Sequence, residues 1–160
     1  MLKIKKFTVN PLQENAYVIS DETDKCIFID PGFFFREEHT KIIKYVSDNR
    51  LKPVMIANTH CHFDHIMGVE FLRETYNIPF LAHAGDAFWI ENAAEQAEIF
   101  GFSMEPVNMP DSYLDEGKHL EFGNSVFDII HIPGHSPGHV VFYSESDNII
   151  IVGDVLFNGS

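Results

Sequence analysis

Apolar residues along the chain fall into short runs separated by polar segments, and their spacing follows two different periods. Short runs rich in β-branched and aromatic residues predict β-strands. Such runs are found at residues 2–9, 16–20, 25–29, 54–58, 79–82, 118–122, 125–132, 140–144 and 148–152. Helical spacing predicts helices in three other segments, at 37–48, 65–76 and 86–100.

The order of these elements indicates the class of fold. Helices interleave with strands in the first hundred residues, whereas only strands are expected after residue 118. Strands that are apolar throughout are usually covered on both faces. The segment 102–114 contains Pro106 and Pro110 and is predicted to be a loop, and Gly101 is placed to end the helix before it. The pattern predicts one domain built from layers of α and β structure.

Composition narrows the classes of partner. The chain has 11 Lys plus Arg against 24 Asp plus Glu, a formal net charge of −13, so no nucleic acid partner is expected. No stretch approaches the roughly 18 apolar residues that span a membrane, and the start lacks the apolar segment of a signal peptide. Two cysteines, Cys26 and Cys61, are too few for a disulfide framework. We therefore expect a cytoplasmic protein with a small-molecule substrate and no membrane partner.

Four potential metal ligands follow the apolar run 54–57 within six positions. They are His60, His62, Asp64 and His65. The alternating His60 and His62 can converge on one cation, and the next two ligands can reach a second cation beside it. Imidazole and carboxylate groups suit Zn²⁺, iron or manganese better than Ca²⁺.

Two later segments repeat this arrangement of an apolar run followed by a ligand. The run 127–132 leads into the sequence PGHSPGH at 133–139, which contains His135, and the run 149–152 leads into Gly153 and Asp154. Loops at strand ends are where rigid scaffolds hold reactive groups. Three strands that each deliver ligands to one edge of a sheet predict a metal site.

The order HxHxDH, then GHSPGH, then GD resembles the metallo-β-lactamase superfamily, in particular its small glyoxalase II-like hydrolases. The supporting segments are 15–17, 29–32 and 153–157, and the similarity extends from about residue 8 to residue 160. The resemblance implies that residues 1–160 form a four-layer αββα sandwich. It also implies two Zn²⁺ ions per complete site, with iron or manganese as alternatives.

The resemblance assigns a role to each candidate ligand. His60, His62 and His135 correspond to the three imidazole ligands of the first metal. Asp64 and His65 correspond to ligands of the second metal, and Asp154 corresponds to the carboxylate that bridges the two ions.

One part of the family pattern has no counterpart in the sequence. A further histidine ligand and a Gly-Arg-Thr segment normally follow the bridging carboxylate, and neither is found before Ser160. We therefore interpret the chain as truncated at its carboxyl end, without its final strand and helix. The sheet edge left open predicts self-association, and the second metal is expected to bind more weakly than the first.

The other histidines are expected to support the fold or the site. His139 could be a ligand by its spacing from His135, but an orienting role is favoured. His83 ends a strand near a helix start and is interpreted as structural. No motif surrounds the remaining three, which are interpreted as surface or core residues: His39, His119 and His131.

Three residues near the motifs are given supporting roles. Cys61 occupies the variable position between two ligands, so its side chain should point away from their metal. Asp30 is placed to cap a turn, and the resemblance suggests that it also supports the ligand loop. Thr59 is expected to hydrogen-bond within that loop.

The chemistry expected of this site is hydrolysis by a metal-bound hydroxide, because a metal lowers the pKa of bound water to about 7. Asp64 could orient the hydroxide and is the candidate catalytic residue. The resemblance suggests a thioester substrate such as an acyl-glutathione conjugate, whose thiolate leaving group needs little protonation. Two alternatives stay open: a mononuclear iron sulfur dioxygenase of the same superfamily, and a catalytically incompetent fragment. Metal content, two zinc ions against one iron, distinguishes the hydrolase from the oxygenase.

Overall fold

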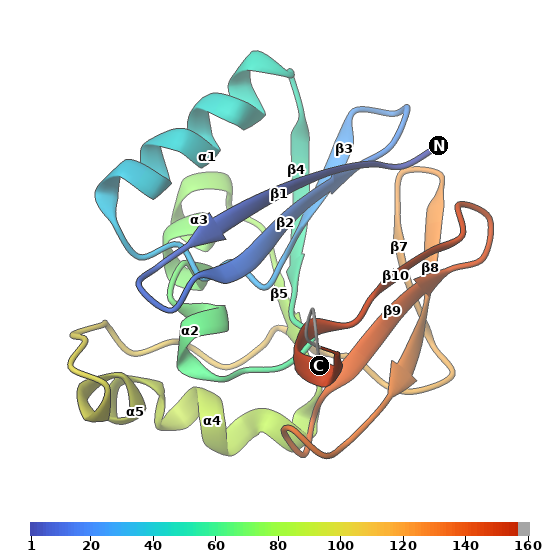
Figure 1. Cartoon of the computed structure of the whole chain (residues 1–160). Coiled ribbons are helices and arrows are strands. Elements are labelled where there is room, and N and C mark those ends of the chain that lie inside the picture. The colour runs from blue at the N-terminus through green and yellow to red at the C-terminus, as the bar shows by residue number, and fades with distance from the viewer. Residues whose placement is uncertain (157–160) are drawn as a thin grey trace.

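The fold consists of two β-sheets that face each other (Figure 1). The computed structural model describes residues 1–156. The first sheet has six strands in the order β1 (Lys3–Val9), β2 (Glu14–Ser20), β3 (Lys25–Ile29), β4 (Lys52–Ala57), β5 (Phe80–Ala82) and β6 (Ser112–Tyr113). The second sheet has four strands in the order β10 (Ile149–Ile151), β9 (Val140–Ser144), β8 (Ser125–His131) and β7 (His119–Phe122).

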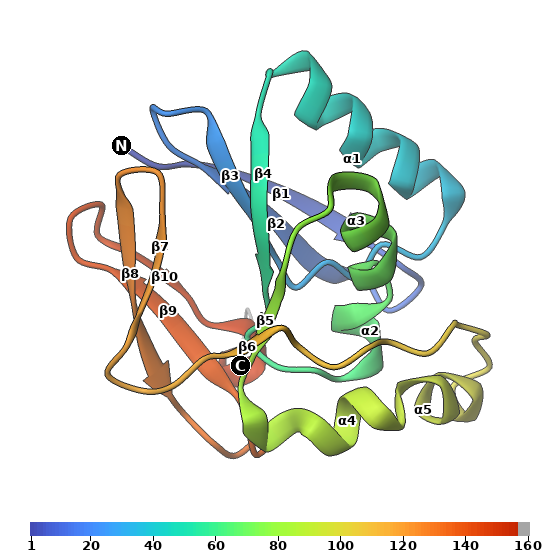
Figure 2. The same cartoon turned by 180° about the vertical axis from the view of Figure 1, so that it is seen from behind.

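The helices lie on the side of the six-stranded sheet that faces away from the second sheet, or below it, as the two views in Figures 1 and 2 show. They are α1 (Arg36–Asp48), α2 (Phe63–Ile66), α3 (Val69–Tyr76), α4 (Ala87–Glu91) and α5 (Ala93–Ile99), with short 3₁₀ turns η1 (Ala84–Asp86) and η2 (Gly153–Val155). The mixed α/β class is thus confirmed. Within residues 1–156 three of the four expected layers are present, because no described helix covers the outer face of the second sheet. Nor is any helix in this range long and apolar enough to cross a bilayer.

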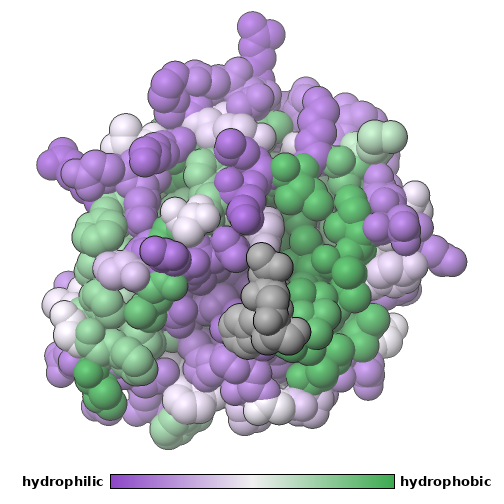
Figure 3. Space-filling view, in the orientation of Figure 1, coloured by the Kyte–Doolittle hydropathy of each residue, from purple (hydrophilic) through white to green (hydrophobic). Residues whose placement is uncertain are grey.

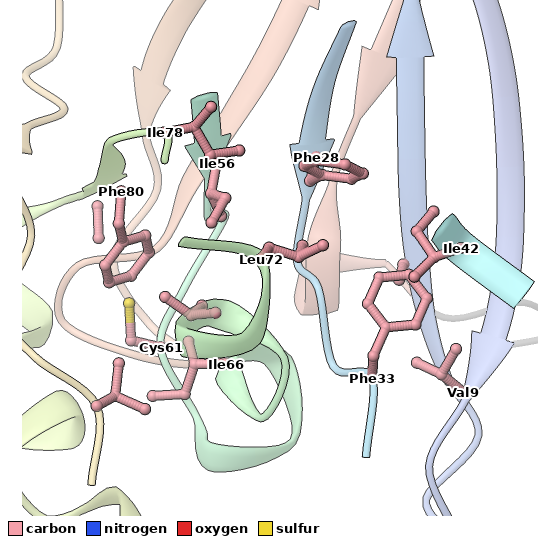
Figure 4. Packing of buried hydrophobic residues seen from close by; sticks show 14 of the residues in the cluster. Val9, Phe28, Phe33, Ile42, Ile56, Cys61, Ile66, Leu72, Ile78 and Phe80 are labelled. Atoms are coloured by element: carbon pink, nitrogen blue, oxygen red, sulfur yellow. The ribbon is translucent and has the colours of Figure 1, made fainter. Parts of the chain in front are cut away.

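Strand β3 shows why the central strands are apolar throughout. Cys26 and Phe28 point to the helical side, where they join the core cluster drawn in Figure 4. Ile27 and Ile29 alternate with them and pack between the two sheets. Both faces of this strand are therefore buried, as expected for a strand without polar alternation.

Sheet topology brings the candidate ligands to one edge. Strands β3 to β6 run parallel, so the loops that follow β3, β4 and β5 leave the sheet at the same edge. The second sheet contributes the loop between β8 and β9 and the turn after β10. A backbone hydrogen bond from Val140 N to Thr59 O, at 2.7 Å, joins the two sheets there.

The predicted helix at 65–76 is two helices, α2 and α3. The break falls at Gly68, whose N–H donates to Pro31 O at 2.8 Å. A Cβ atom at this position would lie 2.6 Å from that oxygen, so the close approach requires glycine. The continuous helix was wrong because helical spacing carries no information about this tertiary contact.

The predicted helix at 86–100 is also divided, into η1, α4 and α5, with Asn92 between the two α-helices. The predicted helix end at Gly101 is confirmed. Gly101 has φ of +83°, its N–H donates to Glu98 O, and Phe102 N donates to Ala97 O. The loop predicted at 102–114 contains the two-residue strand β6.

Candidate metal centre

Three histidines converge at the common edge of the sheets. His60 lies just after β4, His62 is the N-cap residue of α2, and His135 lies in the loop between β8 and β9. One ring nitrogen of each lies within 4.8 Å of the others, and His62 Nδ1 is 3.1 Å from His135 Nε2. We call these three residues the first cluster. His60 is buried and His135 is partly exposed, so the cluster opens toward solvent.

A second cluster, Asp64 and His65, lies beside the first. Asp64 Oδ2 is 3.6 Å from His65 Nε2. The carboxylate of Asp154 stands between the two clusters. Its Oδ2 is 3.2 Å from His135 Nε2 and 3.8 Å from His60 Nε2, whereas its Oδ1 is 3.5 Å from His65 Nε2. The structure therefore brings all six predicted ligands together, and their binding of metal stays a prediction.

The donor set fits divalent cations. His60 Nε2 is buried and has no hydrogen-bond partner among the described residues, and such orphaned buried polar atoms are uncommon. Burial, together with the neighbouring His65 and His62, holds the pKa of His60 well below its usual range. Its imidazole is therefore neutral, which is the form that binds metals.

Two buried carboxylates face the other side of the His65 ring. Its Nδ1 lies 3.3 Å from Asp30 Oδ2 and 3.5 Å from Glu14 Oε1. Burial opposes charge on His65, but Asp154, Asp30 and Glu14 together raise its pKa well above its usual value. Burial also raises the pKa of Glu14, which His65 partly offsets. With this raised pKa both ring nitrogens carry protons, so a cation at Nε2 must displace one, while the acceptors behind the ring keep the proton on Nδ1.

Asp30 fixes the loop that carries His60. Its Oδ1 accepts a hydrogen bond from Thr59 N at 2.6 Å, and its Oδ2 accepts one from Thr59 Oγ1 at 2.5 Å. The expected support of the ligand loop by Asp30 and Thr59 is confirmed. Asp30, His60 and His65 also have ligand atoms within 4.8 Å of one another. Because both Asp30 oxygens already accept hydrogen bonds, we interpret Asp30 as a support of the loop.

Sequence reasoning missed Asp86, which joins the two ligand loops. This fully buried carboxylate accepts hydrogen bonds from Cys61 N at 2.9 Å and from Ser136 Oγ at 2.9 Å, both through Oδ2. Its Oδ1 accepts a third from Gly138 N at 2.6 Å. A carboxylate just after β5, at the same sheet edge as His60, was the only signal in the sequence. Glu14, the first residue of β2, was missed as well, because nothing in the sequence indicates that it faces His65, which is distant along the chain.

The remaining polar residues have supporting positions. His139 is buried, and its Nε2 accepts a hydrogen bond from Asp154 N at 3.1 Å, so it holds the carboxylate between the clusters. Cys61 packs in the core cluster on the helical side (Figure 4). The rings of His83 and His131 stack outside both clusters, with their centroids 4.1 Å apart.

Facing sheets with helices on one side, and histidines and carboxylates gathered at one edge, define an α/β protein with a candidate metal site. The sequence model described as "Metallo-beta-lactamase superfamily" matches residues 9–160, and the chain belongs to this superfamily. Its members bind metal ions, and the first cluster is positioned for such a site.

Two curated relatives and one solved structure illustrate the similarity. The chain is 36% identical to the "Probable metallo-hydrolase YqgX" of Bacillus subtilis, over 99% of this chain and 73% of that protein. It is 30% identical to the "Hydroxyacylglutathione hydrolase GloC" of Haemophilus influenzae, over 99% of this chain and 74% of that protein. The crystal structure of TTHA1623 in a di-iron-bound form superimposes with a TM-score of 0.85 at 37% identity, over 98% of this chain and 74% of that chain. These relatives support a metal-dependent hydrolase.

Proposed function

We propose that the protein hydrolyses a thioester, such as an acyl-glutathione conjugate, with two divalent cations held by the two clusters. The observation that carries the proposal is the position of Asp154. One of its oxygens faces His135 at 3.2 Å and the other faces His65 at 3.5 Å, as a carboxylate shared by two cations requires. Zinc is the proposed metal, with iron or manganese as alternatives, and the di-iron form of TTHA1623 supports iron among them.

The chain's own residues prepare the site for this reaction. Cations bound there would supply a hydroxide nucleophile near neutral pH and polarise the scissile carbonyl. Asp64 borders a cavity of about 270 Å³ that is also lined by Asp30, His65 and Asp154. From this position we propose that its carboxylate orients the attacking water and accepts its proton. The leaving thiolate then needs no acid.

The thioester is proposed from the relatives and from leaving-group chemistry. The relative from Haemophilus influenzae is named a hydroxyacylglutathione hydrolase, at 30% identity. The relative from Bacillus subtilis is named only as a metallo-hydrolase. A cytoplasmic location is part of the proposal. It is supported by Cys26 and Cys61, which are both buried and form no disulfide.

The two alternatives predict different metal contents. A mononuclear iron oxygenase would use two histidines and one aspartate, which leaves the second cluster without a role. A catalytically incompetent fragment would bind metal weakly and turn over no substrate. The contacts of Asp154 with both clusters favour the dinuclear hydrolase.

The proposal is tested by metal analysis together with hydrolysis of a panel of acyl-glutathione thioesters. We expect two metal ions per chain, turnover that a chelator abolishes, and recovery when Zn²⁺, Fe²⁺ or Mn²⁺ is added. His135→Ala should lose turnover. The matched control is His119→Ala, which removes an exposed histidine paired with Asp128 at 2.9 Å, outside the site. Turnover that survives the chelator would contradict the proposal, and one iron with oxygen consumption would favour the oxygenase.

A further inference from the structure

An apolar cavity of about 460 Å³ opens beside the first cluster. On one side its lining includes His62 and His135, together with the carboxylates of Asp64 and Asp154. The rest of the lining comes from the loop after β1, α2 and the α4–α5 segment. These residues are Leu12, Phe63, Trp89, Gln96, Ile99 and Phe100. This volume falls in the range of small-molecule sites, about 300–1,000 Å³.

The apolar wall is fixed directly against the candidate ligands. The ring of Trp89 meets the ring of His62 at 4.9 Å in an edge-to-face arrangement. Gln96 Nε2 donates to Trp89 O at 3.1 Å, which ties α5 to α4. The ring centroid of Phe100 lies 5.1 Å from that of Phe63. A group that enters this cavity would therefore keep a defined position relative to the first cluster.

Apolar side chains at this cavity remain exposed to solvent. Ile99 is 82% exposed and Phe100 is 61% exposed, although both line the cavity. Apolar surface left in water around a concave site is typical of a binding surface, because a ligand that covers it gains its burial free energy. None of the described lining residues is Lys or Arg, so the cavity offers no partner for the carboxylates of a glutathione leaving group.

We propose that this cavity binds the acyl group of the substrate and that the preferred acyl groups are extended and apolar. The inference rests on the proposed thioester hydrolysis and specifies its substrate class. The cavity and the first cluster share His62 and His135, so a chain lying along Trp89 and Phe100 leaves its carbonyl at the metal site. A polar lactoyl group would gain little from these walls.

The test keeps the leaving group constant and varies the acyl chain. The substrates are S-acetyl-, S-butyryl-, S-hexanoyl- and S-lactoylglutathione, assayed with the metal-loaded protein. Each methylene that becomes buried should raise kcat/KM roughly fourfold, so butyryl should exceed acetyl by on the order of tenfold. Phe100→Ala should flatten this dependence. Tyr113→Ala is the matched control, because Tyr113 is also an exposed aromatic residue, at 49%, but does not line the cavity.

A second measurement does not depend on turnover. Trp89 is the only tryptophan of the chain, so its fluorescence reports binding in the cavity. The probes are two thioethers that cannot be hydrolysed, S-hexylglutathione and S-methylglutathione. We expect the hexyl compound to change the Trp89 emission at a concentration at least tenfold lower than the methyl compound.

The outcomes separate the two proposals. Equal affinity for the two thioethers, or a preference for lactoyl over hexanoyl, would overturn the assignment of the cavity even if hydrolysis is observed. Binding that depends on chain length, without hydrolysis of any thioester, would support the cavity and refute the thioesterase. A rise in both binding and kcat/KM with chain length, lost in Phe100→Ala and kept in Tyr113→Ala, supports both.

Discussion

Replacing Asp86 with alanine removes the acceptor that three buried donors share. The donors are Cys61 N, Ser136 Oγ and Gly138 N, at 2.9, 2.9 and 2.6 Å. Each buried donor left without a partner costs about 1–3 kcal/mol. The three costs are not additive, because the two loops can relax together. We expect a loss of about 3–5 kcal/mol in the free energy of unfolding, a large part of the roughly 5–15 kcal/mol of a typical domain.

Asp86→Asn makes the test more specific, since it preserves the volume of the side chain. One oxygen remains as an acceptor, but the amide NH₂ must face at least one of the same donors. The expected loss is about 1–3 kcal/mol, between wild type and Asp86→Ala. The matched control is Asp128→Asn, which changes a half-exposed carboxylate paired with His119 and should shift stability by less than about 0.5 kcal/mol.

Urea unfolding followed by Trp89 fluorescence measures the stability, and competition with a chromogenic chelator measures metal affinity. For a chain of this length, 3 kcal/mol corresponds to a decrease in Tm of about 6–12 °C. Asp86 holds the loops that carry His62 and His135, so metal affinity should fall about 10–100-fold in both variants. The reasoning is refuted if Asp86→Asn has the stability and metal affinity of wild type, because the two loops would then be held by other contacts.

Three further predictions follow from the same contacts. Asp154→Ala should remove most metal-dependent turnover, because it takes away the carboxylate between the clusters. The thioester assay with and without a chelator checks this. Activity that survives both the substitution and the chelator would place the chemistry elsewhere. Burial and the stacked His131 lower the pKa of His83, so the unfolded chain binds a proton there that the native state does not. The contribution of His83 to the free energy of unfolding is therefore fully present above the pKa of the unfolded chain, about 6.5. It is lost as the pH falls below that value. NMR titration should give His83 a pKa below about 6.5 that rises in His131→Gln, and an unchanged value would contradict the pairing. We also propose self-association through β10, which pairs only with β9 within residues 1–156. Ile150 on this strand is 55% exposed, and apolar surface gathers over β9 and β10 in Figure 3. Light scattering that gives a monomer at high protein concentration would refute the proposal.

The predictable parts of the molecule are those that short-range patterns encode. The strand at Lys25–Ile29 has the predicted bounds because its apolar run ends at Asp30 and Pro31. The candidate ligands could be named because each of three apolar runs is followed within three residues by a histidine or an aspartate. The expectation that all three strands belong to one sheet was wrong, because β4 lies in the first sheet and β8 and β10 lie in the second. The packing of the two sheets against each other turns the linear pattern into a spatial cluster.

The contacts that support the cluster could not be predicted, because they depend on partners distant in sequence. Asp86 meets Gly138 and Ser136, and Glu14 meets His65. Neither carboxylate has a local signature that distinguishes it from a surface residue. The break at Gly68 has the same origin, since its cause is the carbonyl of Pro31.

The wide spacing of the cluster along the chain has a consequence for biosynthesis. His60 and His62 leave the ribosome well before His135, by roughly 4–15 s at a synthesis rate of about 5–20 residues per second. During that interval the two imidazoles have no third partner, and the backbone bond from Val140 to Thr59 that joins the sheets cannot yet form. The nascent chain therefore presents only an incomplete ligand pair, which binds metal weakly and discriminates little between ions. Metal acquisition is expected after synthesis, when the second sheet has docked and the geometry that selects the ion exists.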